Sequence, residues 1–402
     1  MKKPELLAPA GTLEKLKIAV HYGADAVYLG GKAFGLRSLA GNFTLDELRE
    51  GLSYAHERGV KVFLTLNAYP DNTELPSLQS YLEELAPLPV DAYIAADPGV
   101  IAMIRQVSPG REIHLSTQAN TTNWQSVLFW QQQGIKRINL AREMSLEGIR
   151  TVREKVSAEL EIFVHGALCI SYSGRCLLSN LLSRRNANKG ECSHPCRWRY
   201  ALVEETRPGE YFPIREDAGG TFIFNSRDLC LLPYLPELVA SGVDSLKIEG
   251  RMKGIYYVAS TVRIYRAALD RLAADPSGYR CEPSWIEELQ KVSHRGYTSG
   301  FLLGQPGDVD QEYHSRYLRS YEFVGVVVEA AIDGSVVVEV RNQIRLGDTI
   351  EWLGRDMRLH LHTFNELCNE SLAQLEVAHP NQRIRIVPRF PAEQFDLLRK
   401  AR

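Results

Sequence analysis

Four cysteines are the residues of this chain whose type and spacing most clearly predict chemistry. Cys169, Cys176 and Cys192 lie in one stretch with glycines and polar loops, and Cys230 follows in the segment FNSRDLCLL. The composition is that of a cytosolic enzyme, and disulfides are rare in that compartment. The odd total of seven cysteines also disfavours a complete disulfide framework. These thiols therefore indicate a metal or iron–sulfur site.

The spacing leaves the ligand set open. Cys192 and Cys196 form a CxxxC pair around His194, so five thiols compete for four places and one of that pair is spare. An iron–sulfur cluster needs about four thiolates. Structural zinc would use the same thiols, with His194 as a further candidate, and unligated buried thiols are the third possibility. Cys281 and Cys368 stand alone, and we expect both to be inert.

The same stretch is rich in basic residues with aromatic residues between them, a pattern that suits RNA binding. Arginine pairs with phosphates, and aromatic rings stack on unpaired bases. An equally compatible interpretation is a solvated loop whose arginines pair with nearby acids. The residues are Arg175, Arg184, Arg185, Lys189, Arg197 and Arg199, with Tyr172, Trp198 and Tyr200. Downstream, His294 and Arg295 in HRGYTSGF predict a tight loop near a site, or a plain connector.

A third group of polar residues follows the expected strands at their carboxyl ends. The group comprises Asn67, Tyr69, Asp97, 116–120, Arg142, Glu143, His165, Lys247, Glu249 and Arg251. In a barrel these ends converge on one mouth, which is where barrel enzymes work. Asn67, Gln118 and Arg142 would then offer hydrogen bonds, and Lys247 or Arg251 would bind a carboxylate. Taken singly, each residue could be structural, His165 as a core histidine, and Glu249 and Arg251 beside Lys247 as a buried ion pair.

Alternating apolar runs and amphipathic segments supply the elements that must position these residues. Strands are expected at 4–10, 25–31, 61–67, 91–97, 112–118, 137–143, 160–166 and 243–250. Helices are expected between them, with Thr44 and Glu47 as a capping box and Pro98 opening another helix. Eight alternations predict a (β/α)8 barrel. A doubly wound open sheet is the alternative, disfavoured because no GxGxxG follows the first strand.

Changes in the pattern of apolar and polar residues along the chain predict the domain boundaries. We expect a barrel domain over 1–275 with a cysteine-rich insert at about 167–231, a connector over 276–319, and a small all-β barrel over 320–402. Asp333-Gly334 predicts a hairpin turn in that last part. The formal net charge of −2 restricts any polyanion site to a local patch. We expect no membrane-spanning segment, no leader peptide and a cytoplasmic location.

Several of these motifs together resemble a known family. The segment EIFVHGALCISYSGRCLLS (161–179) is similar to the signature of the peptidase U32 (collagenase-like) family. Further matches are LLAPAG, GADAVYLGG, GECSHPCRW, NSRDLCLL, SLKIEGRMK and HRGYTSGF, which span essentially the whole chain. The last two, with the C-terminal β domain, point to the branch that takes part in making 5-hydroxyuridine at the wobble position of tRNA.

The resemblance implies an activity, cofactors and partners. It implies an iron–sulfur cluster, of the 4Fe–4S type, and an oxygen-independent hydroxylation linked to prephenate. On the family pattern the ligands are Cys169, Cys176, Cys192 and Cys230, with Cys196 in reserve. The implied partners are the tRNA anticodon stem-loop, a small dicarboxylate at the Lys247/Arg251 region, and a related chain of the same family. Sister branches hydroxylate ribosomal RNA or ubiquinone precursors.

The family label also raises proteolysis as an alternative. A protease needs a nucleophile with a base, or a metal-bound water. The sequence has no HExxH and no GxSxG motif, and a thiolate pair of Cys169 with His165, four residues apart, is a conceivable arrangement.

Overall fold

Eight parallel strands close into a barrel, as the alternation predicts. The structure, a computed structural model, describes residues 2–36, 41–168, 178–197, 216–217, 220–221, 227–304 and 320–402. The barrel strands are β1 (Glu5–Pro9), β2 (Ala26–Leu29), β3 (Lys61–Leu66), β4 (Ala92–Ala95), β5 (Glu112–Leu115), β6 (Arg137–Asn139), β7 (Glu159–Ala167) and β11 (Ser245–Ile248). Each strand pairs with the next, and β11 pairs with both β1 and β7. That last pairing confirms the predicted (β/α)8 fold and excludes the open sheet.

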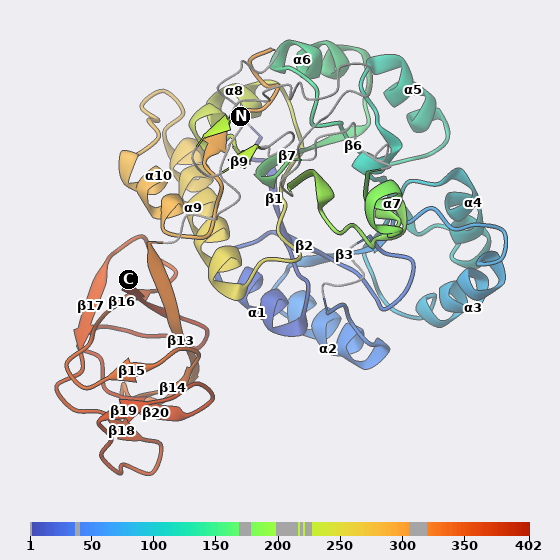
Figure 1. Cartoon of the computed structure of the whole chain (residues 1–402). Helices are drawn as coiled ribbons and strands as arrows, with labels where there is room; N and C mark the ends of the chain where they lie inside the picture. Colours follow the sequence, from blue (N-terminus) through green and yellow to red (C-terminus); the bar gives the residue numbers. More distant parts are fainter. Residues whose placement is uncertain are drawn as a thin grey trace, which may run out of the picture.

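Helices surround the barrel as its outer layer (Figure 1). They are α1 (Leu13–His21), α2 (Leu45–His56), α3 (Leu75–Leu85), α4 (Pro98–Val107), α5 (Trp124–Gln132), α6 (Leu146–Lys155), α8 (Leu235–Ala240) and α9 (Ile255–Ala274). The predicted capping box is present, because Thr44 accepts from the Glu47 amide while the Glu47 carboxylate accepts from the Thr44 amide. α4 begins at Pro98, as predicted, with Asp97 as its N-cap.

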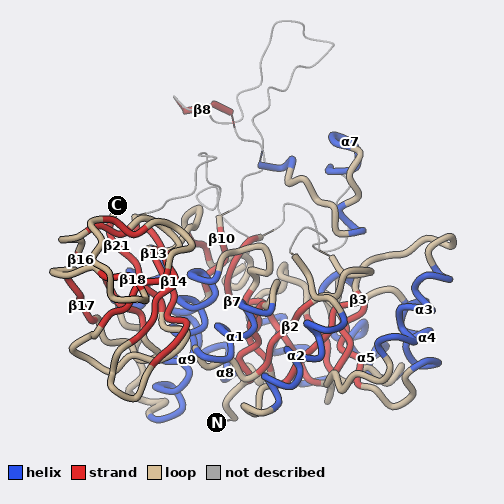
Figure 2. Tube along the Cα trace, turned by 90° about the horizontal axis from the view of Figure 1, so that it is seen from below, coloured by secondary structure: helices blue, strands red, loops and turns tan. Residues whose placement is uncertain are grey.

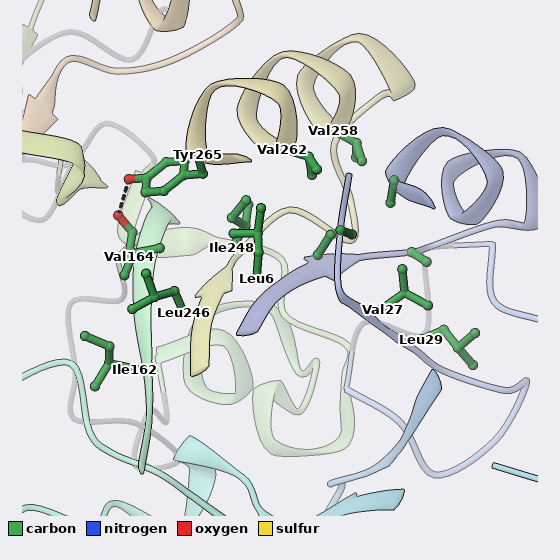
Figure 3. Packing of buried hydrophobic residues seen from close by; sticks show 14 of the residues in the cluster. Leu6, Val27, Leu29, Ile162, Val164, Leu246, Ile248, Val258, Val262 and Tyr265 are labelled. Atoms are coloured by element: carbon green, nitrogen blue, oxygen red, sulfur yellow. Dashed lines mark hydrogen bonds between the residues drawn. The ribbon is translucent and has the colours of Figure 1, made fainter. Parts of the chain in front are cut away.

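The core lies between the strands and this helical layer. Outward-facing Leu6, Leu246 and Ile248 pack towards Val258 and Val262 of α9 (Figure 3). Burying such side chains is the main stabilising contribution of a parallel barrel covered on its outer face. A smaller cluster of inward-facing residues fills the barrel itself: Leu7, Ala26, Tyr28, Phe63, Ala92 and Ile94.

The cysteine-rich insert adds short elements at the end of the barrel where the strands finish. They are α7 (Leu178–Ser183), 3-10 turns at Ala187–Lys189 and Pro195–Arg197, β8 (Glu216–Asp217), β9 (Gly220–Thr221) and β10 (Asp228–Cys230). β10 pairs antiparallel with the end of β7, and β12 (Tyr297–Thr298) pairs with β10. Figure 2 shows α7 on the side of the barrel away from the N-terminus. Cys169, Cys176 and Arg175 lie outside the described residues.

Residues from Tyr321 onward form an antiparallel sheet domain, the all-β class that was predicted. Its strand order is β17-β16-β21-β13-β14-β20-β18, with β15 and β19 paired separately. The strands are β13 (Tyr321–Ala330), β14 (Val336–Val340), β15 (Ile344–Arg345), β16 (Thr349–Leu353), β17 (His360–Thr363), β18 (Cys368–Asn369), β19 (Val377–Ala378), β20 (Arg383–Ile386) and β21 (Leu397–Ala401). The predicted hairpin joins β13 to β14, and Gly334 takes the left-handed conformation (φ 82°) that this turn needs.

A buried charge cluster fastens this domain to the barrel. Arg399 of β21 is 1% exposed and bonds Glu288 in α10 (Pro283–Gln290) at 2.5 and 2.8 Å. Arg399 also bonds Glu351 at 2.6 Å and the Tyr256 hydroxyl of α9 at 3.0 Å. Arg263 of α9 bonds the same Glu288 at 3.0 Å. Figure 1 shows the sheet domain beside α9 and α10, so the two units share one fixed seam.

We expect Arg399→Ala to destabilise the protein strongly. The substitution leaves Glu288 and Glu351 buried with too little positive charge, which typically costs about 3–5 kcal/mol. Urea unfolding of the full chain measures the loss. The exposed pair of Arg49 with Asp46 supplies the control, because Arg49→Ala should change stability by less than about 1 kcal/mol. If both substitutions changed the free energy of unfolding equally, the buried charge cluster would not be what holds the sheet domain to the barrel.

Candidate active site

A cavity of about 940 Å³ opens at the end of the barrel where the strands finish. Its floor consists of side chains from seven strands, most of them near or just beyond the carboxyl end of the strand. These are Tyr28, Thr65, Ile94, Ser116, Asn139, Phe163 and Lys247. This is the position at which barrel enzymes place their substrates. The predicted convergence of strand-end residues on one mouth is therefore present for part of the set.

Two other parts of the chain complete the walls. The sheet domain contributes Tyr321, Glu322, Phe323, Arg341, Asn342 and Arg402, next to Tyr256 and Lys253. The insert contributes Ala187, Asn188, Cys192, His194 and Cys196. This part of the insert is held over the mouth because Lys189 bonds Asp71 and Glu74 at 2.7 and 2.9 Å. Lys189 therefore pairs with nearby acids, which is the alternative to RNA binding that the sequence left open for this basic stretch.

Lys247 reaches the floor of the cavity as one end of a buried ion pair. Its Nζ lies 2.8 Å from Glu161 Oε1 and 4.5 Å from the ring centre of Tyr28, and both charged side chains are almost fully buried. Burial lowers the pKa of Lys247, although Glu161 opposes this shift. Burial alone would raise the pKa of Glu161, but the Lys247 and Arg137 cations keep it below its usual value. The ion pair with Glu161 therefore holds the Lys247 side chain in place inside the barrel.

Arg251 is also engaged within the protein. Its guanidinium donates to Asn42 Oδ1 at 2.6 Å and to Thr65 Oγ1 at 3.0 Å, and the residue is 3% exposed. Arg142 is different, because its guanidinium lies 3.9 Å from the ring centre of Phe163 at the cavity wall. Arg142 has no carboxylate partner in the part of the chain that the structure describes. Arg142, more than Lys247 or Arg251, is thus available to an anionic ligand.

Asn67, Gln118 and Glu249 line the cavity, as expected for residues at strand ends. Asn67 is held from both sides, because its Oδ1 accepts from the Leu36 amide at 3.1 Å and its Nδ2 donates to Ser116 Oγ at 3.3 Å. The backbone carbonyl of Gln118 accepts a hydrogen bond from a tyrosine hydroxyl at 2.7 Å. These contacts fix the rim of the mouth before any ligand enters.

His165 does not line the cavity. It is 1% exposed and lies among the rings of Tyr257, Tyr265 and Tyr297, with ring centres 5.3–5.9 Å apart. The Tyr265 hydroxyl is 3.5 Å from His165 Nδ1. Burial lowers the pKa of His165 to about 3, so its imidazole is neutral at physiological pH. The geometry corresponds to the core-histidine interpretation.

The predicted substrate-binding residues outside the barrel strands are not brought to the cavity. His294 stacks on Tyr297 at 4.6 Å, and Arg295 forms a buried pair with Asp228 at 2.5 Å. Arg184 is exposed and Arg185 is partly buried near the end of α7, and neither lines the cavity. The side chain of Arg197 lies outside the described residues, as does all of Arg175.

Three of the five cysteines predicted as candidate metal ligands are described by the structure. Cys192 and Cys196 line the cavity, and Cys192 Sγ accepts a hydrogen bond from the His194 amide at 3.4 Å, a contact common for cluster thiolates. Cys230 is buried beside Tyr265, and burial raises the pKa of its thiol to about 11. Within the described ranges no three histidine, cysteine or acidic side chains gather as a metal site. Cys192 and Cys196 thus place two thiols at this mouth, where a sulfur-bound group could sit, whereas Cys230 does not line the cavity, and the ligand set stays a prediction.

Asn139 is a cavity residue that the sequence reasoning missed. The strand expected at 137–143 ends at Asn139, so the first polar side chain at the mouth is this one and not Arg142. Strand boundaries are the least reliable part of such predictions. An asparagine within an apolar strand is the signal that could have found it.

A stability measurement tests the environment of His165. Unfolded histidine gains a proton below about pH 6.5, whereas folded His165 stays neutral down to about pH 3. Between these values, acid favours the unfolded state by up to about 1.4 kcal/mol per pH unit. We therefore expect the stability of His165→Phe to fall less steeply than that of the native protein between about pH 6.5 and 4. Identical slopes would contradict the assignment, and the exposed His379→Phe controls for loss of an imidazole.

Comparison with known proteins confirms the resemblance. The chain matches peptidase family U32 over residues 11–312 and the peptidase family U32 C-terminal domain over residues 319–399. It is 43% identical to tRNA hydroxylation protein P1 of Bacillus subtilis, over 96% of this chain and 92% of the relative. It is 40% identical to tRNA hydroxylation protein P of Escherichia coli, over 87% and 86%. It is 34% identical to the 23S rRNA 5-hydroxycytidine C2501 synthase of E. coli, over 87% and 52%. The chain belongs to peptidase family U32.

Proposed function

We propose that this chain is a tRNA-modifying enzyme that converts the wobble uridine to 5-hydroxyuridine. The observation that supports this proposal most strongly is the similarity to tRNA hydroxylation proteins, at 40–43% identity over 86–96% of each chain. The cavity supplies a place for the reaction, because it lies at the catalytic end of a closed barrel. A relative named for hydroxylation of a ribosomal cytidine suggests that hydroxylation of a pyrimidine is common to this part of the family.

The shape and lining of the cavity suit a base that has left its stack. A wobble base must be splayed out of the anticodon loop to enter the barrel. Tyr28 and Phe163 offer aromatic surface at the floor, and Tyr256 and Phe323 offer more at the seam between the domains. Stacking on such rings typically contributes about 1–3 kcal/mol per base.

Positive charge at the rim suits the anticodon stem-loop backbone. Lys15, Lys253 and Arg402 line the outer part of the cavity, and Arg184 on the insert is exposed, whereas Arg341 at the same rim is already paired with Glu14 and Glu339. Neutralising phosphates with such groups releases counterions and gives salt-dependent RNA affinity. The sheet domain thereby acts as a second wall for the RNA. A related chain of the family remains a candidate partner at this surface.

The proposal includes an iron–sulfur cluster, of the 4Fe–4S type, near the mouth. Cys169, Cys176, Cys192 and Cys230 would hold it, with Cys196 in reserve. A bound cluster would supply one-electron redox chemistry to an oxygen-independent reaction. The contribution of the described residues is to hold thiols at the cavity: Cys192 lines it, and its sulfur already accepts an amide hydrogen bond.

Prephenate, or another small dicarboxylate, is the proposed co-substrate. The predicted Lys247/Arg251 clamp is occupied by Glu161, Asn42 and Thr65, so we place one carboxylate at Arg142. Its guanidinium can donate two hydrogen bonds to one carboxylate while its planar face stays on the Phe163 ring.

Proteolysis is disfavoured by the position of His165. An imidazole that is 1% exposed, with its pKa lowered by burial to about 3, is a poor general base for Cys169.

Nucleoside analysis of tRNA tests the proposed activity. Cells lacking this gene, and any redundant relative, should lose 5-hydroxyuridine and its derivatives from total tRNA, and the native chain should restore them. Mass spectrometry of digested tRNA measures the change, with unrelated modified nucleosides as internal controls. Unchanged 5-hydroxyuridine in the gene-less cells, together with a changed rRNA nucleoside, would transfer the activity to another RNA.

Iron content tests the cluster and its ligands. In protein purified without air, Cys192→Ser should lose most of the bound iron and of the brown absorbance, whereas Cys196→Ser should keep both. Cys368→Ser, in the sheet domain, is the matched control for loss of a thiol. Loss of iron in Cys196→Ser alone would reverse the assignment of that pair. An iron-free native protein would remove the cluster from the proposal.

A further inference from the structure

Asn139 carries an amide that the protein leaves unused at the floor of the cavity. The residue ends β6, is 2% exposed and borders the cavity. Both its Oδ1 and its Nδ2 are buried without a hydrogen-bond partner in the described part of the chain. Buried polar groups are rarely left unpaired, because an unpaired group gives up its hydrogen bonds to water and gains none in return. A residue kept at that cost beside a cavity is a candidate for ligand binding.

Neighbouring polar groups on the same floor are already engaged. Lys247 is paired with Glu161 at 2.8 Å, and the Thr65 hydroxyl donates to the Leu29 carbonyl at 2.9 Å. The Ser116 hydroxyl accepts from Asn67. The Asn139 amide thus differs from its surroundings, since it offers a donor and an acceptor side by side that no fold contact consumes.

The chemistry of an amide restricts what could satisfy it. A carboxylate presents acceptors only and would leave Oδ1 unpaired. The pairing edge of uracil presents the N3–H donor next to the O4 acceptor, so it can meet both amide atoms at once. Phe163 and Tyr28 line the same floor, so aromatic side chains border a ring bound in that position.

We propose that Asn139 binds the pairing edge of the uracil base, with Oδ1 accepting from N3–H and Nδ2 donating to O4. This inference rests on the proposed function and adds to it the residue that recognises the base. Binding the base by this edge would leave C5 outside the hydrogen-bonded side of the ring. Recognition then comes from the barrel floor, and the rim and sheet domain supply only backbone affinity.

Equilibrium binding of synthetic RNA tests the proposal without requiring turnover. The probes are an anticodon stem-loop with uridine at the wobble position and the same RNA with N3-methyluridine there, which lacks the N3–H donor. The native full-length chain should bind the methylated probe about 5- to 100-fold more weakly. Asn139→Ala, which removes the amide and makes room for the methyl group, should bind the two probes equally. Gln106→Ala, on the exposed face of α4, is the matched control and should discriminate like the native chain.

Thermal unfolding separates recognition from a structural role. Because Asn139 makes no hydrogen bond within the described fold, Asn139→Leu should unfold at the native temperature or above it. A marked fall in Tm for this variant would overturn the proposal in favour of a structural asparagine.

The remaining outcomes each decide the matter. Equal affinity of the native chain for both probes, or undiminished discrimination by Asn139→Ala, would overturn this inference while leaving tRNA as the substrate. Loss of prephenate binding in Asn139→Ala with discrimination intact would assign the amide to the co-substrate and overturn it as well. Absence of any binding to the stem-loop would overturn the proposed function, and this inference with it.

Discussion

The pairing of β11 with β7 is the constraint on which the rest of the structure depends. It joins the last barrel strand to the seventh across an insert of more than sixty residues, and it closes the sheet. Once the sheet is closed, the carboxyl ends of all eight strands must meet at one mouth. The register of this pair sets Lys247 beside Phe163, at the floor of the cavity. Every functional assignment made for the barrel follows from that closure.

Charge in the interior organises both the barrel and its seam. Within the barrel, Arg137 lies close to Glu5 and Glu161, and Glu161 in turn holds Lys247 at the floor. At the seam, Arg399 joins Glu288 to the sheet domain. Buried ion pairs of this kind add little net stability, but breaking one is costly, so they specify a single arrangement. Here that arrangement places the sheet domain as a wall of the cavity.

Local signals in the sequence were sufficient for the barrel and for many element boundaries. The Thr44 capping box and the opening of α4 at Pro98 are set by residues within one or two turns. β21 was not foreseen, because its buried Arg399 makes LLRKA look like a surface segment. The three residues of β10 are too few for a pattern, and their partner strand β7 lies some sixty residues away.

The site was predicted less completely than the fold. Convergence of the strand ends was predictable, since it follows from topology alone. The partners that occupy Lys247 and Arg251 lie 86 and 209 residues away in sequence, so a local pattern cannot indicate that these cations are already paired. His165 was expected at the barrel mouth because it lies near the carboxyl end of the strand expected at 160–166, but tyrosines from α9 and β12 enclose it. Asn139 was missed because the strand ends earlier than the apolar pattern indicates.

The central claim is that a pyrimidine of tRNA enters the mouth of this barrel. Photocrosslinking tests it most directly, with 4-thiouridine placed at the wobble position of an anticodon stem-loop and the crosslinked peptides mapped by mass spectrometry. The account predicts adducts in the peptides that line the cavity, above all those that contain Phe163 or Asn139. Crosslinks confined to the outer surface of the sheet domain, or to helices α3 and α4, would contradict it.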